Sequence, residues 1–262
     1  MKNKDLKLLY DHVYQQGKQN YFSKFEDGKN ISDTDRVVLA ATNWVDKLVL
    51  DVGCGTGTTT HLISQAGAKH VFGIDFSEEA VSIAIQTYHS DNLSFQATSL
   101  HEWIQPVDVV VSCGTLEHMD DPGGALRKMG TLVSPGGTIL ITCPYFLNIR
   151  GFIWMTLQTL LEVPMSLTDL YFISPFDIEN WLAGTSLHLA GVQTFDYDWG
   201  NGVHMLRDLK KRLTNALRDA NLKNSNVDKF IDWLEKAVVY RETHQLGGLE
   251  GATALYRIQK TS

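Results

Sequence analysis

Glycine and aspartate residues recur between positions 51 and 75 in a pattern suited to binding a nucleoside. Asp51 precedes three alternate glycines, Gly53, Gly55 and Gly57, and Asp75 follows about 20 positions after them. Glycine tolerates positive φ and lets a ligand approach the backbone, because it has no Cβ. An acidic side chain at this spacing is placed to accept hydrogen bonds from ribose hydroxyls. The stretch therefore predicts a loop that binds a sugar-bearing ligand.

Two strands and a helix must position these residues. Leu48–Val52 is a short apolar run with branched side chains, which favours a strand buried on both faces. After the glycines, Leu62, Ile63 and Ala66 predict a helix. A second strand, His70–Ile74, ends directly before Asp75. The order strand, turn, helix, strand is typical of an α/β protein.

The spacing of the glycines excludes the common dinucleotide loop. That loop has the pattern G-x-G-x-x-G, because the pyrophosphate must lie on the N-terminus of the helix. Counted from Gly53, its third glycine would be at position 58, which is Thr58 here, whereas the actual third glycine is Gly57. A nicotinamide-dependent oxidoreductase is therefore disfavoured.

Two segments carry a resemblance to a known family. The segment VLDVGCGTG at positions 49–57 and the acidic Asp75 resemble the first and second motifs of the class I S-adenosylmethionine-dependent methyltransferases. LEHMDDP at positions 116–122 resembles a small-molecule branch that includes the quinone-biosynthetic O-methyltransferases. The resemblance implies a Rossmann-like fold with a mostly parallel seven-stranded sheet, helices on both faces and helical cap insertions. It also implies S-adenosylmethionine as methyl donor and S-adenosylhomocysteine as product.

The resemblance also suggests which residues contact the donor. The glycine turn would face the methionine part, Asp51 its amine and Asp75 the ribose. Phe76 either lies against the adenine or fills the core. Ser99 and Leu100 replace the usual acidic contact to the adenine, and Tyr21 either touches the methionine part or packs on the core. The candidate donor-binding residues are Tyr21, Asp51, Gly53, Cys54, Gly55, Gly57, Asp75, Phe76, Ser99, Leu100, Cys113 and Leu116.

His118 is the candidate catalytic residue. A neutral imidazole near the donor can take a proton from a hydroxyl as it is methylated, which favours oxygen as the acceptor atom. The same side chain can instead hydrogen-bond the loop and shape the pocket. Some relatives bind a divalent metal through E-x-x-E-H at this place, but Gly114 replaces the first Glu. No required metal is therefore expected.

The rest of the chain predicts a core with helical additions. We expect an N-terminal helical cover over 1–45, the donor-binding core over 46–144, a lid insertion over 145–190, and the last strands over 191–262 with a helical cap at about 200–246. One cover helix is expected from Asp33 or Thr34 to Trp44, with Ser32 or Asp33 as its cap. The sixth strand is expected at Val192–Asp198 and the last at Ala252–Ile258.

The segment GFIWMTLQTLLEV at positions 151–163 is apolar almost all round, so it is expected to be a buried helix. It could serve as a lid over the substrate, a dimer contact or an interfacial membrane helix. It is too short to span a bilayer, and no apolar run reaches about 18 residues. The expected acceptor is a small, partly hydrophobic molecule, and a homodimer is left open.

Composition narrows the remaining possibilities. The formal charge of −7 disfavours a nucleic-acid partner, and the basic run at 207–212 is expected to be a solvated helix face. Three cysteines, Cys54, Cys113 and Cys143, make no disulfide framework and are expected to be apolar fillers. The N-terminus lacks a signal-peptide core, so a cytoplasmic location is expected. Methyl transfer to nitrogen or carbon, and a donor-binding regulatory module without turnover, remain alternatives.

Overall fold

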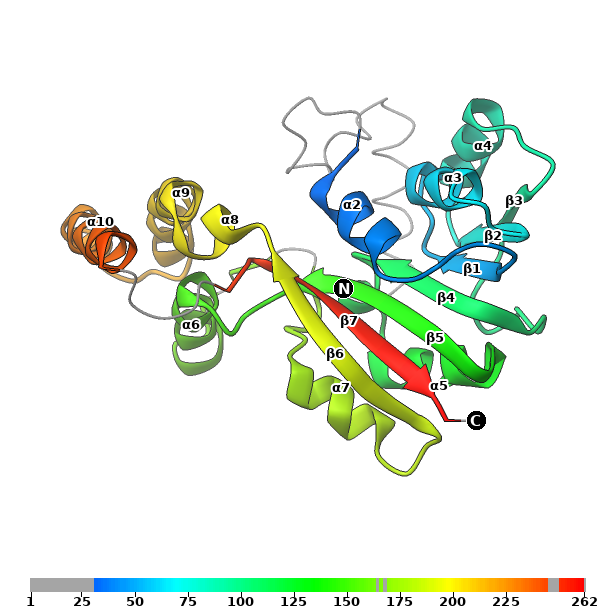
Figure 1. Cartoon of the computed structure of the whole chain (residues 1–262). Helices are drawn as coiled ribbons and strands as arrows, with labels where there is room; N and C mark the ends of the chain where they lie inside the picture. Colours follow the sequence, from blue (N-terminus) through cyan, green and yellow to red (C-terminus); the bar gives the residue numbers. More distant parts are fainter. Residues whose placement is uncertain (1–30, 164, 167–168, 245–249, 262) are drawn as a thin grey trace. The chain divides into compact units, whose positions relative to one another are not determined.

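A computed structural model describes residues 31–163, 165–166, 169–244 and 250–261. Its centre is a seven-stranded sheet in the order β3-β2-β1-β4-β5-β7-β6 (Figure 1). The pairs β1–β2, β1–β4, β2–β3 and β4–β5 are parallel, whereas β6 and β7 run in opposite directions. The predicted mostly parallel seven-stranded sheet is thus confirmed. The strands are β1 (Leu48–Val52), β2 (His70–Asp75), β3 (Leu93–Ala97), β4 (Val107–Cys113), β5 (Val133–Pro144), β6 (Leu187–Phe195) and β7 (Thr253–Lys260).

The central strands are apolar because helices cover them on both faces. Residues 49–52 of β1 are all buried, as are most residues of β4, and such runs are typical of parallel sheets between helical layers. The helices packed with this sheet are α2 (Asp33–Ala40), α3 (Thr58–Gln65), α4 (Glu78–Thr87), α5 (Pro122–Leu132) and α7 (Pro175–Leu182). The parallel strands end at one edge of the sheet, where ligands bind in open α/β folds.

Side-chain caps fix where two of these helices begin. Ser32 caps α2 in a capping box with Asp35, and Ser77 accepts a hydrogen bond from Ala80 N at the start of α4. The Ser32 cap is one of the two that the sequence predicted for α2. The α2 helix ends at Ala40 instead of Trp44, because the chain turns there and the Trp44 indole donates to Leu39 O at 2.9 Å.

Both predicted bounds of the sixth strand are wrong. We expected Val192–Asp198, but β6 begins at Leu187 and ends at Phe195, and a helix begins at Tyr197. This strand is at the edge of the sheet and carries Gly191 near its middle, with several exposed side chains. Glycine and partial exposure weaken the pattern by which a strand is recognised. The last strand, β7, was predicted to within two residues at each end.

The chain forms two compact units. Of the described residues, the first comprises those at 31–143, 175–192 and 255–261, and the second comprises those at 144–163, 165–166, 169–174, 193–244 and 250–254. The second unit contains α6 (Ile149–Met155), the π-helical turn η3 (Thr156–Leu160), α8 (Tyr197–Asn201), α9 (Val203–Asp219) and α10 (Val227–Thr243). The amphipathic pair predicted between the last two strands is thus present as α9 and α10. Within the described ranges, no helix combines the length and apolar character needed to cross a membrane.

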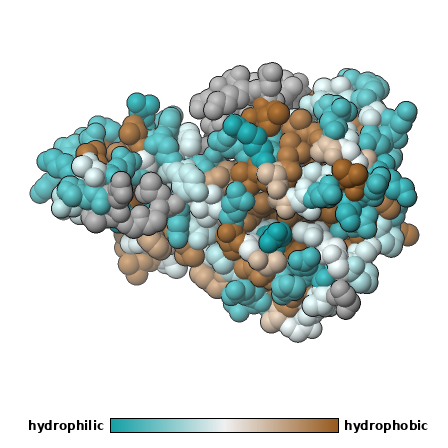
Figure 2. Space-filling model, in the orientation of Figure 1, coloured by the Kyte–Doolittle hydropathy of each residue, from teal (hydrophilic) through white to brown (hydrophobic). Residues whose placement is uncertain are grey.

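The helical segment predicted at 151–163 is less buried than the sequence predicted. It is present as α6 and η3, but only Gly151 and Trp154 of these two elements are buried. Phe152 is 60% exposed and Leu160 is 73% exposed. Figure 2 shows hydrophobic patches among hydrophilic ones on the viewed face of the molecule. The lid, dimer and membrane interpretations of this segment therefore stay predictions.

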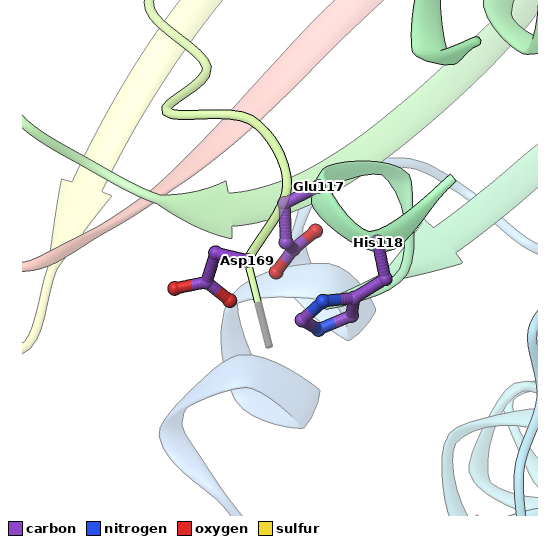
Figure 3. A group of neighbouring side chains, drawn as sticks. All are labelled: Glu117, His118 and Asp169. Carbon is purple, nitrogen blue, oxygen red and sulfur yellow. The ribbon is translucent and has the colours of Figure 1, made fainter. Parts of the chain in front are cut away.

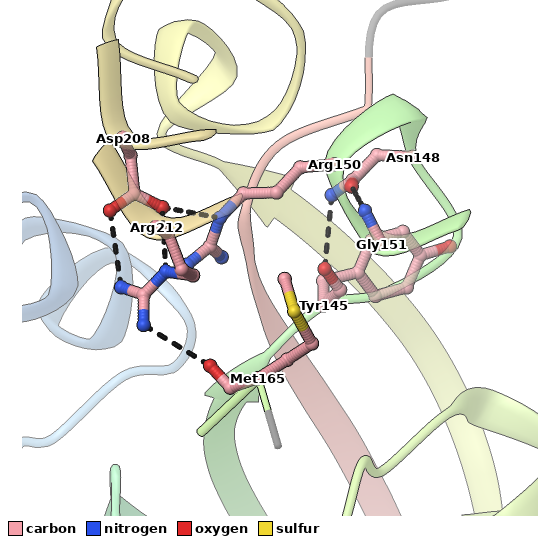
Figure 4. A network of polar contacts seen from close by, with 7 residues as sticks. All are labelled: Tyr145, Asn148, Arg150, Gly151, Met165, Asp208 and Arg212. Carbon is pink, nitrogen blue, oxygen red and sulfur yellow. Dashed lines mark hydrogen bonds and ion pairs between the residues drawn. The ribbon is translucent and has the colours of Figure 1, made fainter. Parts of the chain in front are cut away.

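A charged cluster lies inside the second unit. The Asp208 carboxylate accepts from Arg212 Nη2 and Nε at 3.1 and 3.2 Å and lies 3.6 Å from Arg150 Nε (Figure 4). The two guanidinium groups lie 4.3 and 4.7 Å from the centre of the Trp154 ring. Burial lowers the pKa of Arg150, and Asp208 opposes that shift. Asp208 therefore compensates two guanidinium groups that are largely shielded from water.

We predict that Asp208→Ala lowers the free energy of unfolding by about 3 kcal/mol, because it leaves poorly solvated arginines without their carboxylate. Chemical denaturation of the full chain measures this loss. The matched control is Asp219→Ala, which removes a 60% exposed carboxylate paired with Arg218 on the same helix and should change stability by less than about 0.5 kcal/mol. Equal effects of the two substitutions would contradict the prediction.

Candidate donor-binding site

The loop between β1 and α3 depends on its glycines. Gly53, Gly55 and Gly57 have φ angles of 74°, 52° and 88°, which side-chain-bearing residues rarely adopt. A Cβ on Gly53 would also overlap the side chain of Thr115, in the loop after β4. The loop thus exposes its backbone at the carboxyl edge of the sheet and packs closely against the segment that leads to Leu116.

Asp75 ends β2 and is held by backbone donors. Its Oδ2 accepts from Gly55 N at 2.9 Å, and its Oδ1 accepts from Ser77 N at 2.9 Å. A carboxylate oxygen can accept more than one hydrogen bond. The two bonds therefore fix the carboxylate beside the glycine loop.

Asp51 is a buried acid directly below this loop. It is 2% exposed, and its Oδ2 accepts from Thr60 Oγ1 at 2.7 Å. Its Oδ1 accepts no hydrogen bond from the described residues. Burial raises the pKa of Asp51 from 3.8 to about 7, against the lowering effect of the Thr60 hydroxyl, and the charges of Asp35 and Asp75 raise it further. A cation at this place would stabilise the ionised carboxylate.

Two further buried acids were missed in the sequence. Asp35 is 5% exposed and accepts from Thr59 Oγ1 at 2.6 Å, while Glu117 is 3% exposed. In the sequence, Asp35 fits the capping-box pattern of its own helix, so the pattern gives no sign of a second role. Glu117 entered the sequence analysis only as part of the LEHMDDP segment. Among the described residues, no Lys or Arg is as buried as these acids.

The end of β4 carries Cys113, Leu116 and His118. Leu116 and His118 bound the single turn η2 (Leu116–His118), and Figure 3 shows the Glu117 and His118 side chains leaving it. Leu116 is fully buried, whereas His118 is half-buried. Burial raises the pKa of the Cys113 thiol well above its usual value, and it does the same for Cys54. Both thiols therefore stay protonated, which agrees with their expected role as fillers.

The segment after β3 holds an acid that the sequence analysis overlooked. The hydroxyls of Thr98 and Ser99 donate to Glu102 Oε2 at 2.9 and 3.0 Å, and Leu100 is buried. The hydrogen bond from Ser99 N, at 3.0 Å, and then those from the two hydroxyls lower the pKa of Glu102. Ser99 is thus engaged by a carboxylate three residues further on. Phe76 is half-buried next to Asp75, and Tyr21 lies outside the described residues.

The structure therefore brings several predicted residues together. The Gly55–Asp75 hydrogen bond joins the glycine loop to the end of β2, Asp51 lies at the base of the loop, and Thr115 joins the loop to the segment after β4. S-adenosylmethionine combines an ammonium, a sulfonium, a ribose and no phosphate. Anionic acceptors beside an exposed backbone loop fit such a ligand.

Comparison with known proteins decides the family. A family model described as a methyltransferase domain matches residues 45–171. The ubiquinone biosynthesis O-methyltransferase of Escherichia coli is 31% identical over 178 residues, which are 60% of this chain and 72% of that protein. The chain belongs to the class I S-adenosylmethionine-dependent methyltransferases. It is an enzyme that uses S-adenosylmethionine as methyl donor.

Two further proteins are similar to this chain, one in sequence and one in fold. The ubiquinone biosynthesis O-methyltransferase of Methylococcus capsulatus is 29% identical over 196 residues, covering 69% of this chain and 80% of that protein. The magnesium protoporphyrin IX methyltransferase of Synechocystis PCC 6803, solved with bound SAH, has a TM-score of 0.60 at 14% identity and covers 97% of this chain and 99% of that one. The latter likeness shows the shared fold.

Donor binding should depend on pH through Asp51. A cation favours the ionised carboxylate, so S-adenosylmethionine should bind about eightfold more tightly at pH 7.5 than at pH 6, given a pKa of about 7. Titration calorimetry at both values measures this change. Because the amine of the donor also titrates near neutral pH, the effect is read as the difference between wild type and Asp51→Asn. Equal pH dependence in the two proteins would contradict the role of Asp51.

The raised pKa of Asp51 also determines how the stability of the ligand-free protein changes with pH. A pKa raised above its unfolded value contributes stability below pH 3.8, and this contribution is lost as the pH rises through about 7. The ligand-free protein is thus penalised at neutral pH by one ionised buried acid. The rise in melting temperature caused by the donor should accordingly be larger at pH 7.5 than at pH 6.

Proposed function

We propose that this chain methylates an oxygen atom of a small, partly hydrophobic acceptor. The similar proteins from M. capsulatus and E. coli are both named O-methyltransferases. Their sequence similarity to this chain extends well beyond the donor loop. The LEHMDDP segment supports the same branch. The observation that carries the proposal is the imidazole of His118 on the one-turn helix directly after β4, at the ligand-binding edge of the sheet.

In this proposal the donor lies along the carboxyl ends of β1 and β2. The backbone of Gly53, Cys54, Gly55 and Gly57 faces the methionine part. Asp51 binds the ammonium, and Asp75 accepts from the ribose hydroxyls. Phe76, Ser99 and Leu100 border the adenine, while Cys113 and Leu116 line the wall beside the methyl group. The positive φ angles of the loop and the fixed Asp75 carboxylate support this placement.

For this reaction the protein must chiefly align the acceptor with the donor, and the donor itself needs little activation. The acceptor oxygen attacks the methyl carbon in line with the sulfur, the carbon–sulfur bond breaks, and its electron pair goes to sulfur. The sulfonium thereby becomes the neutral thioether of S-adenosylhomocysteine. The hydroxyl proton goes to the imidazole of His118. Neither Cys54 nor Cys113 competes as a base or nucleophile, because burial keeps both thiols protonated.

The acceptor class is tested with the labelled donor and three matched sets of compounds, which are phenols or enols, amines, and activated carbon acids. We expect label transfer to the oxygen acceptors. Transfer only to nitrogen or carbon would contradict the oxygen assignment. Donor binding without transfer to any compound would favour a binding module.

The role of His118 is tested in the same assay. His118→Gln should lower kcat by about 100-fold or more, the usual contribution of general acid–base catalysis, while the Kd for the donor stays within about twofold. If His118 only shapes the loop, its loss would instead weaken donor binding and leave the dependence of kcat on pH unchanged. The exposed His101→Gln, on the same unit, is the matched control and should change neither quantity.

A further inference from the structure

Asp35 uses its two carboxylate oxygens for different purposes. Its Oδ2 accepts from Ser32 Oγ at 2.7 Å and from Ser32 N at 3.3 Å, which completes the capping box of α2. Its Oδ1 leaves that helix and accepts from Thr59 Oγ1 of α3 at 2.6 Å. Capping therefore uses only Oδ2, and Oδ1 links α2 to the helix that follows the glycine loop.

Two neighbouring threonines each hold one buried acid. Thr59 donates to Asp35, and Thr60 donates to Asp51. Both threonines lie in the first turn of α3, where the helix dipole favours negative charge. The two carboxylates come from α2 and β1 and meet at the same turn, directly after the loop that faces the donor.

Within the described ranges, no buried Lys or Arg accompanies this pair of acids. Asp35 and Asp51 are both at least 95% buried, and no Lys or Arg of the described chain reaches that burial. Asp51 Oδ1 also accepts no hydrogen bond from the described residues. Buried charge is costly unless it is paired. The site is therefore suited to a ligand that brings positive charge.

Donor and product differ in that charge. S-adenosylmethionine carries an ammonium, a sulfonium and a carboxylate, so its net charge is positive when the amine is protonated. Transfer of the methyl group converts the sulfonium into a neutral thioether, and S-adenosylhomocysteine has no net charge. The two ligands are otherwise almost the same size and share the ribose and adenine contacts.

We propose that Asp35 is a positioning residue of the donor site, which acts with Asp51 to make the site favour the cationic donor over the neutral product. Asp35 does not touch the reacting atoms. It adds a second negative charge at the start of α3 and holds that charge in place through Thr59. This preference assists product release, because the attraction weakens at the moment the methyl group leaves.

The proposal is tested by measuring the Kd of both ligands by titration calorimetry, at pH 7.5, in the full chain. Asp35→Asn keeps the shape of the side chain and removes its charge. It should weaken binding of S-adenosylmethionine about fivefold or more relative to binding of S-adenosylhomocysteine, because both ligands carry the ammonium and only the charge on sulfur differs. A donor analogue with a protonated amine in place of the methylsulfonium should respond like the donor.

Two controls separate charge from capping. Asp33→Asn removes an acid from the same helix that is 53% exposed and pairs with Arg36 at 2.6 Å, so neither Kd should change. Ser32→Ala breaks the capping box and leaves Asp35 charged, so the melting temperature should fall while the ratio of the two Kd values stays constant. Each variant is followed by thermal unfolding as well as by binding.

The proposal is overturned if Asp35→Asn shifts both Kd values by the same factor, or shifts only the melting temperature as Ser32→Ala does. Should Asp35→Asn fail to fold, Thr59→Val replaces it. This variant releases the Asp35 carboxylate from α3, and the ratio of Kd values should again move toward the product. An unchanged ratio in Thr59→Val would then overturn the proposal.

Discussion

The hydrogen bond from Gly55 N to Asp75 Oδ2 joins the glycine loop to the end of the neighbouring strand. It is possible only because β1 and β2 are parallel and in register, so that both end at the same edge of the sheet. The loop that carries this amide has positive φ at Gly53, Gly55 and Gly57, which side-chain-bearing residues rarely adopt. The loop, the acid and the start of α3 are thereby held in one arrangement before any donor arrives, which lowers the entropic cost of binding.

That arrangement gathers negative charge, and none of the lysines and arginines in the described part of the chain is buried to the same degree. Asp51 and Asp35 are held by consecutive threonines in the first turn of α3, which follows the loop directly. Burial and mutual repulsion raise the pKa of Asp51 to about 7, so the ligand-free protein carries a cost that a cationic donor relieves. The buried charge that donor binding requires thus lowers the stability of the ligand-free protein.

Local patterns in the sequence were sufficient for much of this structure. The strand β1 has the bounds predicted from its sequence, β2 differs by one residue at its end, and Ser32 caps α2 as expected. The start of β6 was wrong because an edge strand with a central glycine has a weak pattern. Asp35 was missed because its partner Thr59 is 24 positions away, and nothing local indicates which face of α2 meets α3. Glu102 was missed because its contacts are made by a loop.

The central claim is that Asp75 holds the ribose of the methyl donor, and its most direct test is the Kd of S-adenosylmethionine measured by titration calorimetry for wild type and Asp75→Ala. The account predicts a loss of affinity of about 30-fold or more, because hydrogen bonds to a charged acceptor contribute about 1.5–3 kcal/mol each. The exposed Asp91→Ala, in the same unit, should bind the donor like wild type. An unchanged Kd in a folded Asp75→Ala protein would contradict the account.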